Sequence, residues 1–321
     1  MKKIISLITA LALVLGFAGC SKKQATPSNN KINVICTVFP QYDIVRTIAS
    51  DKANIAMLLP PGGEPHSFEP TPKDILNIQN SDVFIMIGGE SEKWAEKIIE
   101  SAGKNKTEVL KLIDCVDTLD EEVTEGMEEE EDVHDEDEND GDEHEHEDDE
   151  HIWTSPDNMI VMTKQIYKTL CKADPKNKEL YKSNTEAYVN KLSALSDELK
   201  EIAESGKRKT LVFADRFPFR YLTESLGIEY YAAFPGCSSQ TEPSASTIAF
   251  LIDKIKKENI PAVFYVDYTD PRIAKSISKD TTVKTLRMYS CHTVSKEDFE
   301  NGETYLSLME KNVAAIKEAL N

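Results

Sequence analysis

Residues 32–59 read INVICTVFPQYDIVRTIASDKANIAMLL, and this stretch indicates the fold class. Apolar and β-branched residues dominate 32–38 and 54–59, which predicts two strands, while residues 42–49 between them have a helical pattern. A strand, a helix and a second strand form a βαβ unit, and such units build a mostly parallel sheet. The stretch therefore predicts an α/β protein.

The same alternation continues on both sides of one long helical region. It predicts helices at 73–80, 92–102, 219–226, 244–258, 271–278 and 304–320, and strands at 83–87, 109–112, 210–213, 230–233, 262–266 and 284–289. Between these two sets, residues 158–205 read as helical, with a break before Pro175 because proline disfavours helix in the residue preceding it.

The second part of the helical region is long enough to act as a rigid connector. One face of it carries apolar side chains, namely Tyr181, Tyr188, Leu192, Leu195 and Leu199. We expect two lobes, each with a mostly parallel sheet flanked by helices, joined by this one long rigid helix. The expected boundaries are an N-terminal lobe at 31–157, a helical region at 158–206 and a C-terminal lobe at 207–321.

The first thirty residues have the features of a secretory signal and a tether. Two lysines precede an apolar stretch at 4–17, which is shorter than a membrane span. Gly19-Cys20 resembles the end of a bacterial lipobox, in which Cys20 is diacylated and becomes the mature N-terminus; an ordinary signal peptide with an incidental cysteine is the alternative. We expect a signal peptide at 1–19, a lipidated flexible tether at 20–30, and anchoring on the extracytoplasmic face of the cell membrane.

Residues 120–150 form an acidic run with twenty-one Asp and Glu and no Lys or Arg. The chain's net charge is −20, so the remainder is nearly neutral and gives no reason to expect nucleic acid as a partner. The run includes His134, His144 and His146, and imidazole interleaved with carboxylate suits Zn²⁺, whereas oxygen ligands alone suit Ca²⁺. The alternative is a solvated, disordered loop without a specific ligand.

Five cysteines follow Cys20, and none of them forms a Cys-x-x-Cys motif, which argues against a zinc knuckle or a redox motif. Cys237 and Cys291 both follow predicted strands of the second lobe. We expect a disulfide between them, with Cys291 as a thiolate metal ligand as the alternative.

Three histidines lie outside the acidic run, and two of them directly follow predicted strands, where ligands commonly bind. His66 lies in the stiff turn 59–70 (LPPGGEPHSFEP), directly after a predicted strand, and His292 also follows a predicted strand. His151 directly follows the acidic run. A single loop histidine is more often a plain surface residue, so the surrounding motifs matter.

These motifs resemble the metal-binding signatures of zinc/manganese ABC-transporter substrate-binding lipoproteins, of the high-affinity zinc uptake type. The similarity runs from about 31 to 321 and includes PPGGEPHSFEPT (60–71), HIWTSPDN (151–158), ADRFPF (214–219), GCSSQTEPS (236–244) and TYLSLMEKN (304–312). The resemblance implies two α/β lobes bridged by a long helix, one metal in the cleft between them, and docking on a membrane permease driven by an ATPase. Zinc-specific members often carry a His- and acid-rich loop before the second ligand.

The resemblance also implies ligands, although this sequence departs from the family pattern in the second lobe. His66 and His151 carry over directly. The position that usually holds the third ligand is Ala214, which cannot bind a metal; Asp215 could replace it or could instead cap the next turn.

The family's last ligand is an acid in the segment matching 266–271, where Asp267 and Asp270 both qualify. Asp270 could instead cap the helix that starts at Pro271. Our hypothesis is that His292 and one carboxylate, Asp267 or Asp215, complete a nitrogen-rich zinc shell.

The resulting prediction is a monomeric zinc-binding component of an ABC importer, with no enzymatic activity. A site of two histidines and two carboxylates would favour Mn²⁺ instead. A secreted zinc hydrolase is less well supported, because the sequence has no His-Glu-x-x-His motif and no Gly-x-Ser-x-Gly motif. A surface adhesin is a further alternative, but no residue here specifies a receptor.

Overall fold

The computed structural model describes residues 31–101, 106–127, 148–238 and 242–321. The expected signal peptide, the lipidation site Cys20 and the tether lie outside the described residues, as do His134, His144 and His146. Among the helices that are described, none combines the length and the hydropathy that crossing a membrane requires.

The first sheet is a four-stranded parallel sheet with the order β2-β1-β3-β4. Its strands are β1 (Ile32–Cys36), β2 (Ala53–Met57), β3 (Val83–Met86) and β4 (Glu108–Lys111), and the connecting helices are α2 (Phe39–Ala49), α3 (Pro72–Gln79) and α4 (Lys93–Ser101). The predicted alternation of strands and helices is confirmed here, with element ends shifted by a few residues.

The second sheet repeats the same parallel order as β6-β5-β7-β8. Its strands are β5 (Thr210–Phe217), β6 (Glu229–Pro235), β7 (Ala262–Val266) and β8 (Lys284–Met288), connected by α7 (Arg220–Leu226), α8 (Ala245–Glu258) and α9 (Arg272–Thr281). A short helix, α10 (Lys296–Glu300), was not predicted; Ser295 starts it by accepting a hydrogen bond from the backbone N–H of Asp298.

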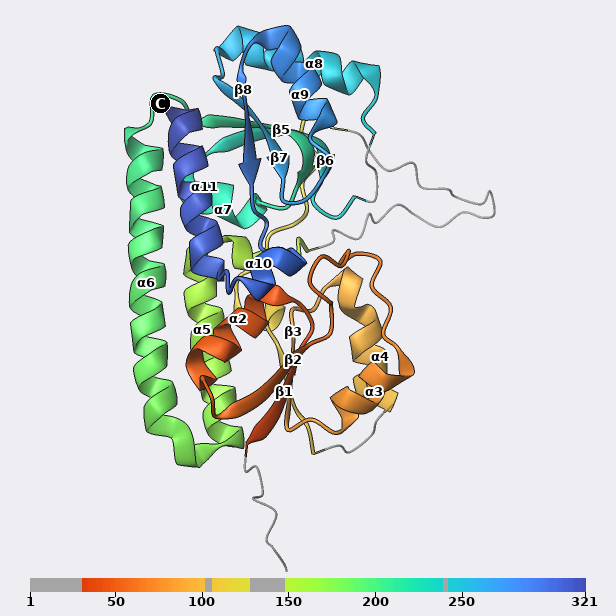
Figure 1. The fold of residues 1–321 in the computed structure, drawn as a ribbon. Helices are drawn as coiled ribbons and strands as arrows, with labels where there is room; N and C mark the ends of the chain where they lie inside the picture. Colours follow the sequence, from red (N-terminus) through yellow and green to blue (C-terminus); the bar gives the residue numbers. More distant parts are fainter. Residues whose placement is uncertain (1–30, 102–105, 128–147, 239–241) are drawn as a thin grey trace, which may run out of the picture. The chain divides into compact units, whose positions relative to one another are not determined.

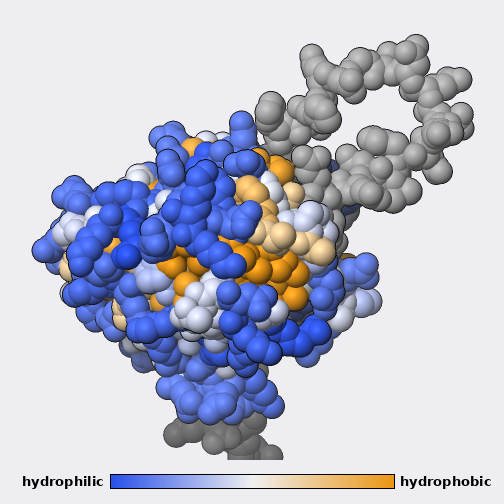
Figure 2. All heavy atoms as spheres, turned by 90° about the horizontal axis from the view of Figure 1, so that it is seen from above, coloured by the Kyte–Doolittle hydropathy of each residue, from blue (hydrophilic) through white to orange (hydrophobic). Residues whose placement is uncertain are grey.

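Side chains alternate between the two faces of each sheet, so both faces are covered. In β1, Val34 packs into the large core shared with the long helices, whereas Ile35 packs against α3 and α4. In β5, Phe213 joins the same large core, whereas Val212 packs against α8 and α9. Parallel sheets are stable in this arrangement because helices shield both faces from water. Most of the outer surface seen from above is correspondingly hydrophilic, with a strip of apolar residues between polar regions (Figure 2).

Two long helices join the sheets into one core. They are α5 (Pro156–Ala173) and α6 (Lys178–Ser205), separated by a 3₁₀ turn that begins at Pro175, where the break was predicted. Helix α6 runs beside α2 of the first sheet and α11 (Tyr305–Leu320) of the second (Figure 1). The apolar face predicted for α6 is buried, with Tyr181, Tyr188, Leu192, Leu195 and Leu199 all in the core.

One buried carboxylate fastens α2, α6 and α11 to one another. Asp43 in α2 accepts hydrogen bonds from the Tyr188 hydroxyl of α6 at 3.3 Å and from the backbone N–H of Tyr305, the first residue of α11, at 3.0 Å. Arg46 one turn further along α2 supplies the opposite charge, with its Nε 2.7 Å from the carboxylate. A charge without solvent is stable only with such partners, so Asp43 fixes the register of the three helices.

Candidate metal centre

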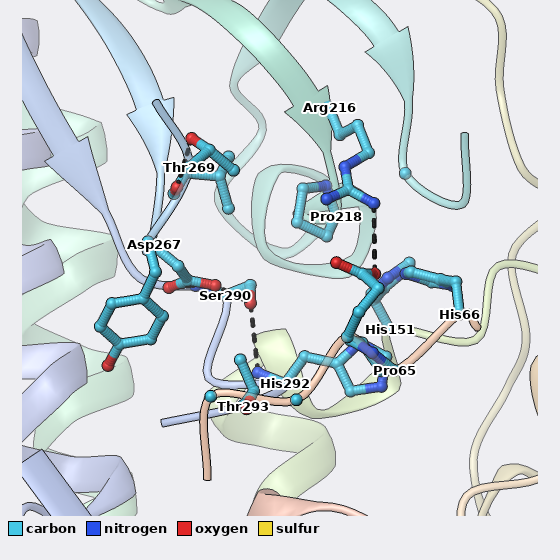
Figure 3. A pocket seen from close by; sticks show the side chains of 16 residues that line it. Pro65, His66, His151, Arg216, Pro218, Asp267, Thr269, Ser290, His292 and Thr293 are labelled. Carbon is cyan, nitrogen blue, oxygen red and sulfur yellow. Dashed lines mark hydrogen bonds and ion pairs between the residues drawn. The ribbon is translucent and has the colours of Figure 1, made fainter. Parts of the chain in front are cut away.

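The carboxyl ends of both sheets open onto one pocket of about 270 Å³ (Figure 3). Its lining includes the loop after β2 with His66, the residue His151 just before α5, and the segment after β8 with His292. Ligands of open α/β sheets bind at this edge, because the loops after parallel strands converge there. The three predicted loop histidines therefore reach the same place from distant parts of the sequence.

The imidazoles of His66, His151 and His292 converge on a common point (Figure 3). One nitrogen of each ring lies within 4.8 Å of the other two, and the ring centres are 5.3–5.7 Å apart. A zinc ion held at about 2.0–2.1 Å by three imidazoles of a tetrahedral shell would place the ring centres about 5 Å apart. The cluster therefore needs only small adjustments to hold such an ion.

His66 is held by a turn that is tied to the second lobe. Gly62 has φ +80°, which glycine adopts without strain, and its N–H donates to the carbonyl of Val294 at 2.7 Å. The N–H of Gly63 donates to the carbonyl of Pro60 and closes the turn. The turn thus presents the His66 side chain, which is 16% exposed, to the pocket.

The carboxylate of Asp149 fixes the position of His151 on the side of the ring that carries Nδ1. The Asp149 carboxylate accepts from the His151 backbone N–H at 2.8 Å and lies 3.0 Å from Nδ1 of the ring. Because a carboxylate only accepts hydrogen bonds, Nδ1 carries the proton and Nε2 is left with a lone pair for a metal. Trp153 of the 3₁₀ turn Ile152–Thr154 packs against both His151 and His292, as expected for a hydrophobic wall.

His292 is held through Ser290 (Figure 3). The Ser290 hydroxyl accepts from the His292 backbone N–H at 3.2 Å, and the Ser290 carbonyl accepts from the Trp153 indole at 2.8 Å. The backbone of Cys291 between them has φ +59°, a left-handed conformation that turns His292 into the pocket. His292 is 6% exposed.

The surroundings keep two of the three rings neutral. Burial lowers the pKa of His66 to about 3, assisted by the neighbouring His151 and Arg216. Burial also lowers the pKa of His292 well below its usual value. For His151, burial acts in the same direction, but attraction to Asp149 and the hydrogen bond with it outweigh burial and raise its pKa. Neutral imidazole is the metal-binding form.

The second-lobe carboxylates have structural partners and do not join the histidines. In the part of the chain that the structure describes, the three imidazoles have ligand atoms within 4.8 Å of one another. Neither Asp215 nor Asp267 has an oxygen in that group. Asp215 accepts from the Val266 backbone N–H at 3.1 Å and from the Thr269 hydroxyl. It therefore ties β5 to the loop after β7 and does not join the three imidazoles here, and a ligand role for Asp215 stays a prediction.

Asp267 has a similar structural role. It accepts hydrogen bonds from the backbone N–H of Ser290 at 2.7 Å and from the Ser290 hydroxyl (Figure 3). Because the Ser290 hydroxyl in turn accepts from the His292 backbone N–H, Asp267 supports His292 indirectly. Asp270 is exposed and accepts from the backbone N–H of Arg272 at 3.0 Å, which matches its alternative interpretation as a cap at the start of α9.

The expected disulfide between Cys237 and Cys291 is absent, because both thiols are free. Cys291 is fully buried in the core, while Cys237 lies 3.9 Å from the Glu150 carboxylate. Burial raises the pKa of each thiol well above its usual value. The sequence reasoning missed the position of Cys237 and also Glu150, whose only signal was its place next to His151 at the end of the acidic run.

Comparisons with known proteins agree with this architecture. The family model described as "Zinc-uptake complex component A periplasmic" matches residues 34–319. The zinc-binding lipoprotein AdcA of Streptococcus pneumoniae is 33% identical over 318 residues; the alignment covers 99% of this chain, and the chain spans only 61% of AdcA's length. The high-affinity zinc uptake system protein ZnuA of Bacillus subtilis is 31% identical over 323 residues, covering 99% of this chain and 98% of ZnuA.

A solved structure supports the same assignment. The Zn(II)-bound ZnuA-like domain of Streptococcus pneumoniae AdcA superposes with a TM-score of 0.73 at 29% identity, covering 90% of this chain and 99% of that domain. The two parallel sheets and the long helix between them are therefore the fold of this group, as predicted. The chain belongs to the family of zinc-uptake complex component A.

Proposed function

We propose that this protein captures Zn²⁺ with His66, His151 and His292 and delivers it to an ABC permease and its ATPase for import. The observation that carries the proposal is the convergence of three imidazole nitrogens within 4.8 Å in one pocket. Binding and release are sufficient for this function, so no catalytic group is required.

The donor set favours zinc over manganese. Three nitrogen ligands and one further position match the usual tetrahedral zinc shell, whereas Mn²⁺ favours carboxylate, carbonyl and water oxygens. Asp267, a second-lobe carboxylate that lines the pocket, already accepts two hydrogen bonds from Ser290. Manganese binding with Asp267 as the oxygen ligand, the alternative function, would require Asp267 to give up these bonds and turn toward the histidines.

The distribution of the ligands couples metal binding to the geometry of the lobes. His66 and His151 belong to the first lobe and His292 to the second, so an ion bound by all three stabilises the state in which the lobes are together. Beside the pocket, Arg216 of β5 lies 3.5 Å from Glu64 of the His66 loop. A permease could recognise this closed arrangement and receive the ion when the lobes separate.

We place the protein at the extracytoplasmic face of the cell membrane as a monomer anchored through Cys20. The sequence features of residues 1–30 and the name lipoprotein given to the relative AdcA support this location. The acidic run, with His134, His144 and His146, would then provide weak, rapidly exchanging metal sites in addition to the main centre.

Replacing His292 with Ala should lower zinc affinity by on the order of 100-fold or more. His292 is a direct ligand in the proposal, and loss of a group that only supports a ligand already lowers metal affinity by about 10- to 100-fold. Competition with a chromophoric chelator measures this affinity, and His144→Ala in the acidic run serves as the control. Equal affinities for the His292→Ala variant and the unmodified chain would eliminate His292 as a ligand.

The pH dependence of zinc binding should report on His151. Its raised pKa means that protons begin to compete with zinc at a higher pH, so affinity should fall as the pH is lowered through that pKa. Asp149→Asn removes the carboxylate charge, so the fall should move to lower pH, and affinity at neutral pH should drop by about 10-fold or more. The exposed neighbour Asp148 supplies the control Asp148→Asn, which should leave both properties unchanged. An unshifted pH profile for Asp149→Asn would contradict the assigned role of Asp149.

Deleting 128–147 should remove weak zinc binding and leave the tight site intact. The deletion must stop short of Asp149, which holds His151, and of Glu121, which accepts from the Cys237 backbone N–H. Isothermal titration with zinc separates the two phases. Loss of the tight phase after this deletion would show that the acidic run contributes to the main site.

A further inference from the structure

A second group of ligand-type side chains adjoins the three histidines. It consists of His66, Glu150 and Cys237, whose donor atoms also lie within 4.8 Å of one another. Nδ1 of His66 is 3.5 Å from Oε1 of Glu150, and Sγ of Cys237 is 3.9 Å from the same oxygen. Glu150 is almost fully buried, so its carboxylate faces these partners and not bulk solvent.

The spacing fits a metal ion as well as it fits hydrogen bonds. In a tetrahedral zinc site with bonds of about 2.0–2.3 Å, neighbouring donor atoms are about 3.3–3.8 Å apart. The His66–Glu150 distance is within that range and the Cys237–Glu150 distance is close to it. The contact from Cys237 Sγ to Glu150 Oε1 is a long hydrogen bond from sulfur, and a bridging cation would also account for the approach of all three donors.

Hydrogen bonds from backbone N–H groups fix the positions of Cys237, in the second lobe, and Glu150, in the first lobe. The N–H of Cys237, just after β6, donates to Glu121 Oε1 at 2.9 Å. The N–H of Ser91 donates to Glu150 at 3.2 Å. Gly89 lies against this carboxylate, since a Cβ there would come within 2.7 Å of it.

We propose that His66, Glu150 and Cys237 form a second metal position for a thiophilic divalent cation such as Zn²⁺ or Cd²⁺. The proposal rests on the proposed function and adds a route for the ion. On binding, the Cys237 thiol forms a sulfur–metal bond and releases its proton to solvent. Because His66 belongs to both groups, one ion can move between them by exchanging the other ligands around this imidazole.

The position of the second group suggests the direction of that movement. Glu150, a member of the group, is the last residue of the acidic run, and Glu121, which contacts Cys237, is the second residue of the run. An ion arriving from that run would therefore meet Cys237 and Glu150 beside the three histidines. Thiolate ligation also favours Zn²⁺ over Mn²⁺ at this step.

Cobalt titration of the reduced full chain tests the second position. A cobalt–thiolate bond gives a charge-transfer absorption in the near ultraviolet that imidazole and carboxylate ligands do not give. We expect this absorption in the unmodified chain, its loss in Cys237→Ser, and its reduction in Glu150→Gln. Cys171→Ser is the matched control, because Cys171 is a partly buried thiol on α5, and should retain the absorption.

The outcomes separate this proposal from the proposed function. Absence of the absorption at saturating cobalt, or its persistence in Cys237→Ser, would overturn the second position while leaving tight zinc binding by the three histidines untouched. His292→Ala should weaken tight binding but keep the thiolate signal. Cadmium NMR of the unmodified chain gives a reading that does not depend on any variant: a resonance shifted by thiolate ligation supports the position, and resonances from nitrogen and oxygen ligands alone contradict it.

Discussion

The continuous apolar core along α6 is the constraint on which the rest of the structure depends. It packs α2 of the first sheet and α11 of the second against one helix, and the buried Asp43 fixes the relative positions of these three helices. With both sheets held by this core, their carboxyl edges border the same pocket. Residues as distant in sequence as His66, His151 and His292 can therefore supply one set of ligands.

The charge distribution around that pocket suits a cation that enters and leaves. Two imidazoles are kept neutral by burial, while the third gains basicity from Asp149. The carboxylates Asp215 and Asp267 are engaged by backbone N–H and hydroxyl groups, so they support the loops around the pocket. The three ligands are imidazoles, and the carboxylates Asp149 and Glu150 contact two of these rings, so negative charge lies next to a bound Zn²⁺ without being part of the three-histidine set.

Periodicity and strand-end reasoning predicted most of the fold and marked His66 and His292, whereas His151 was expected from the resemblance of residues 151–158 to a family motif. The alternating pattern located the strands, and a position directly after a strand marked His66 and His292, because parallel sheets bring such positions to one edge. The roles of Asp215 and Asp267 could not be predicted, since they depend on which backbone N–H groups lie nearby in the folded state. In the sequence, Asp215 was as plausible a turn cap as a ligand, whereas Asp267 was considered only as a ligand.

The cysteines illustrate the same limit. Cys237 and Cys291 both follow strands of the second sheet, and this alone suggested a disulfide. Strand-end position does not specify side-chain direction: the left-handed backbone at Cys291 sends its thiol into the core, while Cys237 faces Glu150. Glu150 was hidden in the acidic run, where composition could not distinguish one buried carboxylate from twenty others.

The most direct test of the central claim is anomalous scattering at the zinc absorption edge from crystals of the zinc-loaded protein. The account predicts the strongest peak between His66, His151 and His292, within about 2.0–2.1 Å of a nitrogen of each. A principal peak bound by Asp215 or Asp267 without His292, or no peak in the pocket, would contradict it.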